Sequence, residues 1–343
     1  MRVGLLTGGG DCPGLNAVIR AAVRKGIDTY KYEMIGIKKG WAGMVEPDAE
    51  PIDLRSVSGI LQRGGTILRT SRTNPDKIEN GFGKCKNAFK VLKMDALIAI
   101  GGEDTLGVAN KLAKMGMPVV GAPKTIDNDL NATDFTFGFD TAVNIVMEAV
   151  DRLHTTAESH DRVMVVEVMG RHAGWIATYG GIAGGADVIL IPEEKFDIEE
   201  ICGLIKSRHA KGKNFSIVVA AEGALPKDAS AFITKGKELD NFGHVKLGGI
   251  GEALAKEIEK RTKFETRATV LGHTQRGGSP TAFDRVLGTR FGIAAIDLVA
   301  KKEWGKMVAL QGNKIISVPL EAAVGTLKTV DKDLFDIAKV FFG

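Results

Sequence analysis

The chain has 343 residues, of which 44% are hydrophobic and 26% charged, as is typical of a globular protein with about two domains. Its formal net charge of +4 is small and no long basic run occurs, which argues against a nucleic-acid partner. The three cysteines form no CxxC pair, and no apolar run is long enough for a signal peptide or a membrane span. We therefore expect a cytoplasmic, reducing setting without structural zinc.

The first predicted strand leads into a glycine-rich turn. Residues 3–6 are apolar, Gly8, Gly9 and Gly10 follow, and apolar positions at 15, 18, 19 and 22 predict a helix. A strand, a glycine-rich turn and a helix together present backbone N–H groups to an anion. The turn matches neither GxGxxG nor GxxxxGK[ST], and a tight turn without a ligand is the alternative.

A second predicted strand, residues 34–37, is followed by Trp41, which we expect to pack against other side chains rather than to stack on a ligand. Residues 63–72 then combine three arginines with three hydroxyl side chains. Guanidinium groups suit phosphate oxygens, so this segment is a candidate phosphate site. A solvated basic loop is an equally good interpretation.

Two successive predicted strands carry acids at their carboxyl ends. The run 96–100 ends in Gly101-Gly102-Glu103-Asp104-Thr105, and a helix is expected from about residue 106 to 115. The run 118–122 ends at Pro123, which cannot donate to a sheet, and leads to Lys124-Thr125-Ile126-Asp127-Asn128-Asp129.

Because ligands bind at the carboxyl ends of parallel strands, we expect these acids to lie together if the two strands are neighbours. They would hold Mg²⁺ through few carboxylates and leave positions for phosphate oxygens and water. A polar surface turn is the alternative for the second loop, since Asn and Asp favour turns.

The second half of the chain repeats the alternation of strands and helices. Helices are expected at 141–159, 247–261 and from about 283, and strands at 163–168, 188–191, 217–221 and 266–271. Residues 224–246 show no period and are expected to form a surface excursion, and the apolar tail 334–342 is expected to dock. The fold class is therefore α/β, with a mostly parallel sheet in each of two domains.

Taken together, these loops resemble those of the 6-phosphofructokinase family over roughly residues 3 to 300. The matching motifs are Gly8-Gly9-Gly10-Asp11, Pro13-Gly14-Leu15-Asn16, Gly101-Gly102, Thr125-Ile126-Asp127-Asn128-Asp129, Val168-Met169-Gly170-Arg171, Glu222, Glu265-Thr266-Arg267, Leu271-Gly272-His273 and Gln275-Arg276-Gly277-Gly278. The resemblance implies two Rossmann-like three-layer domains with the active site in the cleft between them, in a homodimer or homotetramer. It implies a donor-binding domain (1–138 and 275–325) and a fructose 6-phosphate-binding domain (139–274 and 326–343).

The resemblance also implies roles for individual residues. Asp127 would be the base that takes the C1 hydroxyl proton of fructose 6-phosphate, framed by Thr125 and Asp129. Glu103 would bind Mg²⁺, and Arg171 would stabilise the transferring phosphoryl group. The sugar-phosphate site would hold Met169, Gly170, Glu222, His273 and Arg276, with Arg162 and Arg267 reaching it from a neighbouring subunit. The phosphoryl donor would meet Gly10, Arg72, Asp104, Thr105 and Lys124.

Two of these residues bear on the choice of donor. Many ATP-using members of the family have Gly where this chain has Asp104 and Lys124, and this pair resembles the pyrophosphate-dependent branch. An Asp at 104 would fill the space of an α-phosphate and repel it. We therefore expect pyrophosphate as the donor, with ATP as the alternative, and sedoheptulose 7-phosphate stays open as an extra acceptor.

Other classes fit the sequence less well. A dinucleotide-dependent oxidoreductase would need an acid after the second strand, where this chain has Lys38 and Lys39. A sugar-phosphate sensor would need neither a base nor a metal-binding acid. Arg20 and Arg24 match basic residues of the family's effector pocket, but His154 and Asp187 depart from it, so we expect no strong nucleotide regulation.

Overall fold

Two separate β-sheets organise the chain. The computed structural model describes residues 1–228 and 249–343. They divide into unit 1 (Met1–Ile126, Leu130–Thr141 and Arg276–Leu327) and unit 2 (Asp127–Asp129, Ala142–Gln275 and Lys328–Gly343). The sequence placed the main boundaries at 138/139, 274/275 and 325/326. Most of the expected surface excursion, and the expected helix start at 247, lie outside the described residues.

Unit 1 is built on a seven-stranded sheet with the order β11-β10-β5-β4-β1-β2-β3. Its inner strands pair in parallel, while β3 and β11 are antiparallel edge strands. Residues of β4 and β5 are buried throughout, as the continuous apolar runs predict for a sheet covered on both faces. The strands are β1 (Arg2–Thr7), β2 (Glu33–Ile37), β3 (Ala49–Pro51), β4 (Ala96–Gly101), β5 (Val119–Pro123), β10 (Lys306–Gln311) and β11 (Lys314–Pro319).

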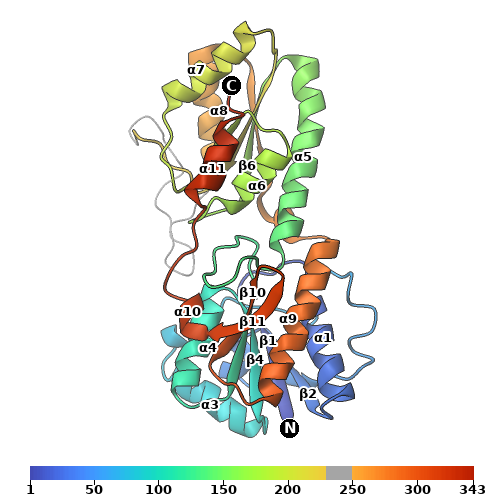
Figure 1. Cartoon of the computed structure of the whole chain (residues 1–343). Coiled ribbons are helices and arrows are strands. Elements are labelled where there is room, and N and C mark those ends of the chain that lie inside the picture. The colour runs from blue at the N-terminus through green and yellow to red at the C-terminus, as the bar shows by residue number, and fades with distance from the viewer. Residues whose placement is uncertain (229–248) are drawn as a thin grey trace. The chain divides into compact units, whose positions relative to one another are not determined.

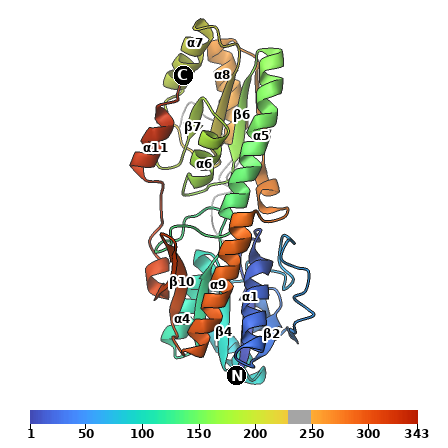
Figure 2. The same cartoon turned by 45° about the vertical axis from the view of Figure 1, so that its right-hand side comes forward.

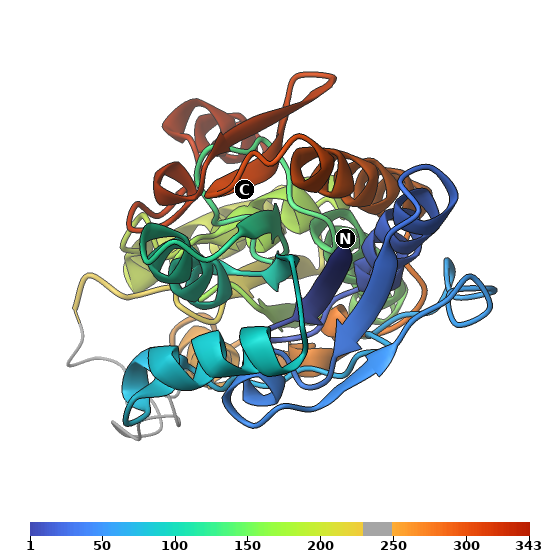
Figure 3. The same ribbon diagram turned by 90° about the horizontal axis from the view of Figure 1, so that it is seen from below.

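Helices cover both faces of this sheet. On one face α1 and α9 lie side by side (Figures 1 and 3), and they approach closely because Gly288 and Gly292 of α9 leave no side chain between them. On the other face, α3 and α4 enclose a core that includes Trp41, Leu106 and Met307. The helices are α1 (Leu15–Asp28), α2 (Ala42–Val45), α3 (Gly81–Val91), α4 (Glu103–Lys114), α9 (Ala282–Ala300) and α10 (Leu320–Ala323), with a 3₁₀ turn, η1 (Pro75–Lys77).

Unit 2 contains a parallel four-stranded sheet with the order β7-β8-β6-β9. Its strands are β6 (Val163–Val168), β7 (Val188–Leu190), β8 (Ser216–Ala221) and β9 (Thr266–Val270). Helices α7 (Ile198–Ala210) and α8 (Ile250–Thr262) pack together and share an apolar core with the sheet. The long helix α5 (Phe139–His160) begins in unit 1, and Gly180 of α6 (Trp175–Ala183) packs against its Val146. The C-terminal helix α11 (Lys332–Lys339) lies beside α6 and β7 (Figure 2).

The structure confirms the α/β class and the expected docking of the tail, where Phe335 and Ala338 are buried. It confirms that Trp41 packs, since the residue is 2% exposed and its indole Nε1 donates to the carbonyl of Thr105 at 3.3 Å. One expectation was wrong: α4 begins at Glu103 rather than near residue 106, so the acids lie in its first turn. No helix among residues 1–228 and 249–343 is long and apolar enough to cross a membrane.

Candidate active site

The glycine-rich loop of unit 1 lies at the carboxyl ends of three neighbouring strands. Strand β4 pairs with β1 on one side and with β5 on the other, so the segments after Thr7, Gly101 and Pro123 emerge at one edge. The Thr105 side chain is 3% exposed and lies beneath this loop, where a Cβ at Gly8 would stand 2.5 Å from its Oγ1. Thr105 therefore packs beneath the backbone of this loop, and the donor contact expected of it stays a prediction.

Lys124 links two of these loops. Its backbone N–H donates to the Gly101 carbonyl at 2.9 Å, and its ammonium group donates to the carbonyl of Gly10. The residue is only 3% exposed, and a Cβ at Gly9, where φ is 79°, would lie 3.5 Å from the Lys124 nitrogen. A buried cation beside a glycine-rich backbone is a suitable environment for a phosphate.

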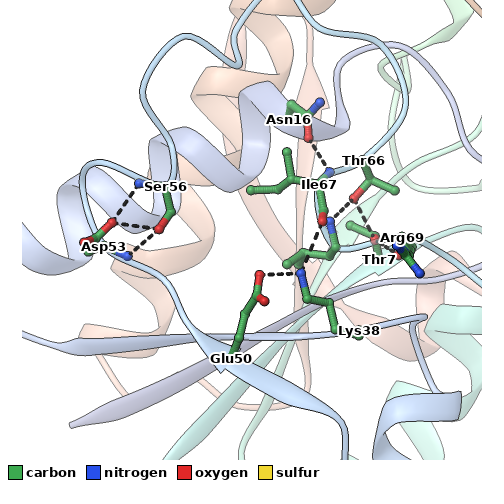
Figure 4. A network of polar contacts seen from close by, with 10 residues as sticks. Thr7, Asn16, Lys38, Glu50, Asp53, Ser56, Thr66, Ile67 and Arg69 are labelled. Carbon is green, nitrogen blue, oxygen red and sulfur yellow. Dashed lines mark hydrogen bonds and ion pairs between the residues drawn. The ribbon is translucent and has the colours of Figure 1, made fainter.

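Side chains of β1 and of the first turn of α1 hold the backbone of the arginine-rich segment 63–72 (Figure 4). The side-chain amide nitrogen of buried Asn16 donates to the Arg63 carbonyl at 3.0 Å. Its oxygen accepts from the N–H of Ile67 at 2.9 Å (Figure 4). The Thr7 hydroxyl lies 3.0 Å from that of Thr66. These contacts come from β1 and the first turn of α1. Their only signal in the sequence is Asn16, a polar residue on an otherwise apolar helix face.

The end of the same segment contacts the glycine-rich loop. The Thr70 hydroxyl donates to the Gly9 carbonyl at 2.6 Å, and the Gly9 N–H donates to the carbonyl of Ser71 at 3.0 Å. Arg72 follows directly and its side chain is exposed. The structure thus brings the backbone on which Arg72 stands to the glycine-rich loop, whose Gly10 carbonyl accepts from Lys124.

The two acids of the first loop stand at the N-terminus of α4. Glu103 and Asp104 are both exposed, and the Glu103 carboxylate accepts from the N–H of Gly325 at 3.3 Å. Acids in a first turn also interact favourably with the helix dipole. The helix itself therefore favours an acid at position 104, whatever the donor is. Within the described ranges, no three His, Cys, Asp or Glu side chains form a metal-binding group.

The residues Asp127–Asp129 belong to unit 2, although they follow β5 closely. Asn128 between them is buried and left-handed, with φ of 51°, a conformation that Asn tolerates better than most residues. Asp127 and Asp129 are half-buried, and the Asp129 carbonyl accepts from the N–H of Lys328 at 3.0 Å. The Thr125 carbonyl, in unit 1, accepts from the Thr136 hydroxyl at 2.8 Å.

A second group of candidate residues stands at the carboxyl ends of the unit 2 strands. Because β6 lies between β8 and β9, the segments that follow these strands are neighbours. The N–H of Glu222 donates to the Val168 carbonyl at 2.8 Å, and that of Gly223 to the Gly170 carbonyl at 3.1 Å. Gly170 has φ of 134°, and its Cβ would lie 2.8 Å from the Ala173 carbonyl oxygen, so only Gly fits there. The structure therefore brings Met169, Gly170, Arg171 and Glu222 together.

The turn after β9, η3 (Gly272–Arg276), carries His273 and Arg276. His273 is exposed in unit 2. Arg276 belongs to unit 1, where its guanidinium donates to the Asp11 carbonyl at 3.3 Å and would lie 2.8 Å from a Cβ at Gly10. The structure thus shows Arg276 against the glycine-rich loop, and the sugar-phosphate contact expected of it from the resemblance stays a prediction.

The phosphofructokinase family profile matches residues 2–299.

The chain belongs to the phosphofructokinase family.

It is 60% identical over 344 residues to a protein of Streptomyces coelicolor (strain ATCC BAA-471 / A3(2) / M145) called pyrophosphate--fructose 6-phosphate 1-phosphotransferase, covering 100% of both chains. A protein of the same strain called ATP-dependent 6-phosphofructokinase 2 is 52% identical over 345 residues, again with 100% of both chains covered. The crystal structure of pyrophosphate-dependent phosphofructokinase from Nitrosospira multiformis has a TM-score of 0.84 at 20% identity. The match covers 100% of this chain and 92% of that one, and it shows the shared fold.

In this member of the family, Arg162 and Arg267 share one acid. Glu265 forms ion pairs with both guanidinium groups, at 2.8 Å to Arg162 and 2.5 Å to Arg267. The hydrogen bond from Arg162 is the main reason why the pKa of Glu265 lies below its usual value. Arg267 and Glu265 remain partly open to solvent, with 52% and 38% of their side chains exposed, so the pair of arginines is held at the surface of unit 2.

The two residues that depart from the family's effector pocket have partners inside unit 2. Asp187 pairs with Arg208 at 2.9 Å and accepts from the N–H of Ile217 at 2.8 Å, while burial raises the pKa of its carboxyl group. The His154 ring nitrogen Nε2 lies 2.8 Å from the Gly184 carbonyl oxygen. Both side chains therefore make internal contacts.

Proposed function

We propose that the protein is a Mg²⁺-dependent phosphotransferase that moves a phosphoryl group from pyrophosphate to the C1 hydroxyl of fructose 6-phosphate. The products are fructose 1,6-bisphosphate and phosphate. The single observation that carries this proposal is the position of Lys124. Its buried ammonium group donates a hydrogen bond to the Gly10 carbonyl at the carboxyl edge of the sheet. Relatives named as pyrophosphate-dependent enzymes reach 59–60% identity, which supports the same donor here.

On the donor side, the loop that contains Gly9 and Gly10 offers backbone groups and Lys124 offers a compact positive charge for the phosphate that leaves. Asp104 would exclude a longer donor, because a carboxylate there occupies the position of a further phosphate and repels it. Arg72 would bind the outer phosphate oxygens with its guanidinium fork. Each of these contacts favours a donor that ends after two phosphates.

Glu103 would hold the Mg²⁺ ion. Mg²⁺ usually binds through one or two carboxylates together with substrate phosphates, so a single exposed acid fits this mode. A carboxylate has acceptor capacity for about four contacts, and the Gly325 N–H uses one of them. When bound, the ion would neutralise charge on the phosphate oxygens during transfer.

On the acceptor side, Asp127 would remove the C1 hydroxyl proton and Arg171 would stabilise charge on the phosphoryl group in transit. Thr125 and Asp129 frame this base. The remaining contacts to the sugar phosphate are proposed for Met169, Gly170, Glu222, His273 and Arg276. We also propose a cytoplasmic homodimer or homotetramer in which Arg162 and Arg267 reach the 6-phosphate bound by a neighbouring subunit.

ATP is the alternative donor. Relatives named as ATP-dependent enzymes are 50–52% identical, and one relative named as a pyrophosphate enzyme is also 52% identical. The helix dipole also gives a reason, independent of the donor, for an acid at position 104. The reverse reaction separates the two. With fructose 1,6-bisphosphate and phosphate alone, ³¹P NMR should detect pyrophosphate and fructose 6-phosphate. If turnover of fructose 1,6-bisphosphate requires ADP, the ATP alternative is correct.

A further inference from the structure

Gln275 is a buried polar residue to which neither the sequence motifs nor the proposed mechanism gives a role. It is 0% exposed and is the last residue of unit 2 before the chain passes to unit 1. Its side-chain Oε1 accepts from the N–H of Met169 at 3.2 Å, and its Nε2 donates to the Gly272 carbonyl at 3.0 Å. The amide therefore joins the segment after β6 to the turn after β9.

The Met169 N–H lies just beyond the sheet. Strand β6 ends at Val168, which pairs with Ala221, and its pairing with β9 ends one residue earlier, at Glu167. The backbone of Met169 is thus fixed by a side chain instead of a neighbouring strand. An amide suits this position because it accepts and donates at once, while a carboxylate only accepts and an apolar side chain does neither.

We propose that Gln275 is a positioning residue for the acceptor loop Met169–Arg171. This inference rests on the proposed function, in which that loop binds fructose 6-phosphate. Without the amide, the Met169 N–H and the Gly272 carbonyl would lose a buried partner, and the loop would no longer be held in one conformation.

The residue after Gln275 contacts the other loop of the proposed site. Arg276, one peptide bond further on, donates to the Asp11 carbonyl in the glycine-rich loop of unit 1. Consecutive side chains therefore hold the acceptor loop and the donor loop. A change at Gln275 acts on the acceptor loop directly, whereas it acts on the donor loop only through the backbone, so acceptor binding should suffer more.

The test compares Gln275→Met with Thr262→Val. Met keeps nearly the volume of Gln and removes both polar atoms. Thr262 is a matched control in unit 2, because its hydroxyl also donates to one carbonyl (Ile258, 2.7 Å) and accepts from one N–H (Phe264, 3.2 Å), and it is 7% exposed. Calorimetric titration with fructose 6-phosphate in the absence of donor should show about tenfold weaker binding for Gln275→Met and a change of less than about twofold for Thr262→Val.

Steady-state kinetics should show the same asymmetry. In Gln275→Met the KM for fructose 6-phosphate should rise about tenfold, while the KM for pyrophosphate should change by less than about threefold. Equal changes in both variants, or unchanged binding in Gln275→Met, would overturn the proposal, because either result reduces Gln275 to a general stabilising residue.

Hydrogen exchange of the Met169 amide provides a readout that does not depend on the substrate. Its exchange should be about tenfold faster in Gln275→Met than in the wild type or in Thr262→Val, and equal rates overturn the proposal. If the wild type binds no fructose 6-phosphate, the proposed function fails, whereas the exchange rates still decide what Gln275 does. If Gln275→Met does not fold, Gln275→Glu replaces it. Glu can still accept from Met169, so protection of that amide should persist, and its loss would refute the role of the acceptor atom.

Discussion

Replacing Lys124 with Met tests the part of the donor site that the structure defines best. Met keeps a side chain of similar length and removes the charge and the hydrogen bond to the Gly10 carbonyl. We expect pyrophosphate-dependent turnover to fall steeply, because the phosphate that leaves would no longer meet a cation. The KM for fructose 6-phosphate should change little, since Lys124 belongs to the donor loops.

The expected fall in kcat follows from the burial of Lys124. Lys124 is 3% exposed, so its charge is only weakly screened by water. One unit of charge about 4 Å from the ammonium group contributes about 4 kcal/mol at an effective dielectric constant of about 20. If the transition state gains most of this interaction, kcat should fall by about 10²- to 10³-fold.

Initial rates at saturating fructose 6-phosphate and pyrophosphate measure this effect. Lys25→Met is a suitable control, because Lys25 is a half-buried lysine of unit 1 that pairs with Asp297 at 2.6 Å, away from the candidate site. The control should keep its kcat within about twofold of the wild type. A kcat for Lys124→Met within about threefold of the wild type would refute the reasoning, provided that the variant unfolds at the same temperature as the control.

Asp127→Ser should lower kcat by about 10²- to 10⁴-fold with little change in either KM, as measured by steady-state kinetics, because it removes the proposed base. Arg162→Ala and Arg267→Ala should each raise the KM for fructose 6-phosphate. Mixing Arg162→Ala with Asp127→Ser should restore some activity if subunits exchange, and a fully active monomer would rule this out. Asp104→Gly should open some use of ATP in rate assays; Asp104→Asn, which keeps the size and removes the charge, should open less if bulk is the obstacle. Burial raises the pKa of Asp284 from 3.8 to about 6. The stability that this carboxyl contributes when protonated is therefore present below about pH 3.8 and is lost as the pH rises through about 6. Asp284→Asn should exceed the wild type in free energy of unfolding by at most about 3 kcal/mol at pH 7.5, and the gap should close near pH 4 in denaturant titrations.

The sequence predicted the inner strands well because their side chains are buried on both faces and form continuous apolar runs. It did not predict the hairpin of β10 and β11, where β11 is a half-exposed edge strand without such a run. The N-terminus of α4 was placed three residues late, because Glu103 and Asp104 are polar and resemble loop residues, whereas acids are favoured in a first helical turn.

The candidate site, too, could be predicted only in part. Its loops could be found from the sequence, because they follow strands and carry glycines, acids and arginines. The directions in which the side chains of these loops point could not be predicted from the sequence. Lys124 reaches back to Gly10, Arg276 lies against Asp11, and Gln275 contacts Met169. Each of these contacts joins segments more than a hundred residues apart, so no local pattern encodes it.

The most direct test of the account is a comparison of kcat/KM for pyrophosphate and for ATP, measured with the wild-type protein, saturating fructose 6-phosphate and Mg²⁺. The proposal predicts a clear preference for pyrophosphate, since a contact that costs several kcal/mol at Asp104 corresponds to at least about a hundredfold difference. A kcat/KM for ATP equal to or above that for pyrophosphate would contradict the account and make ATP the donor.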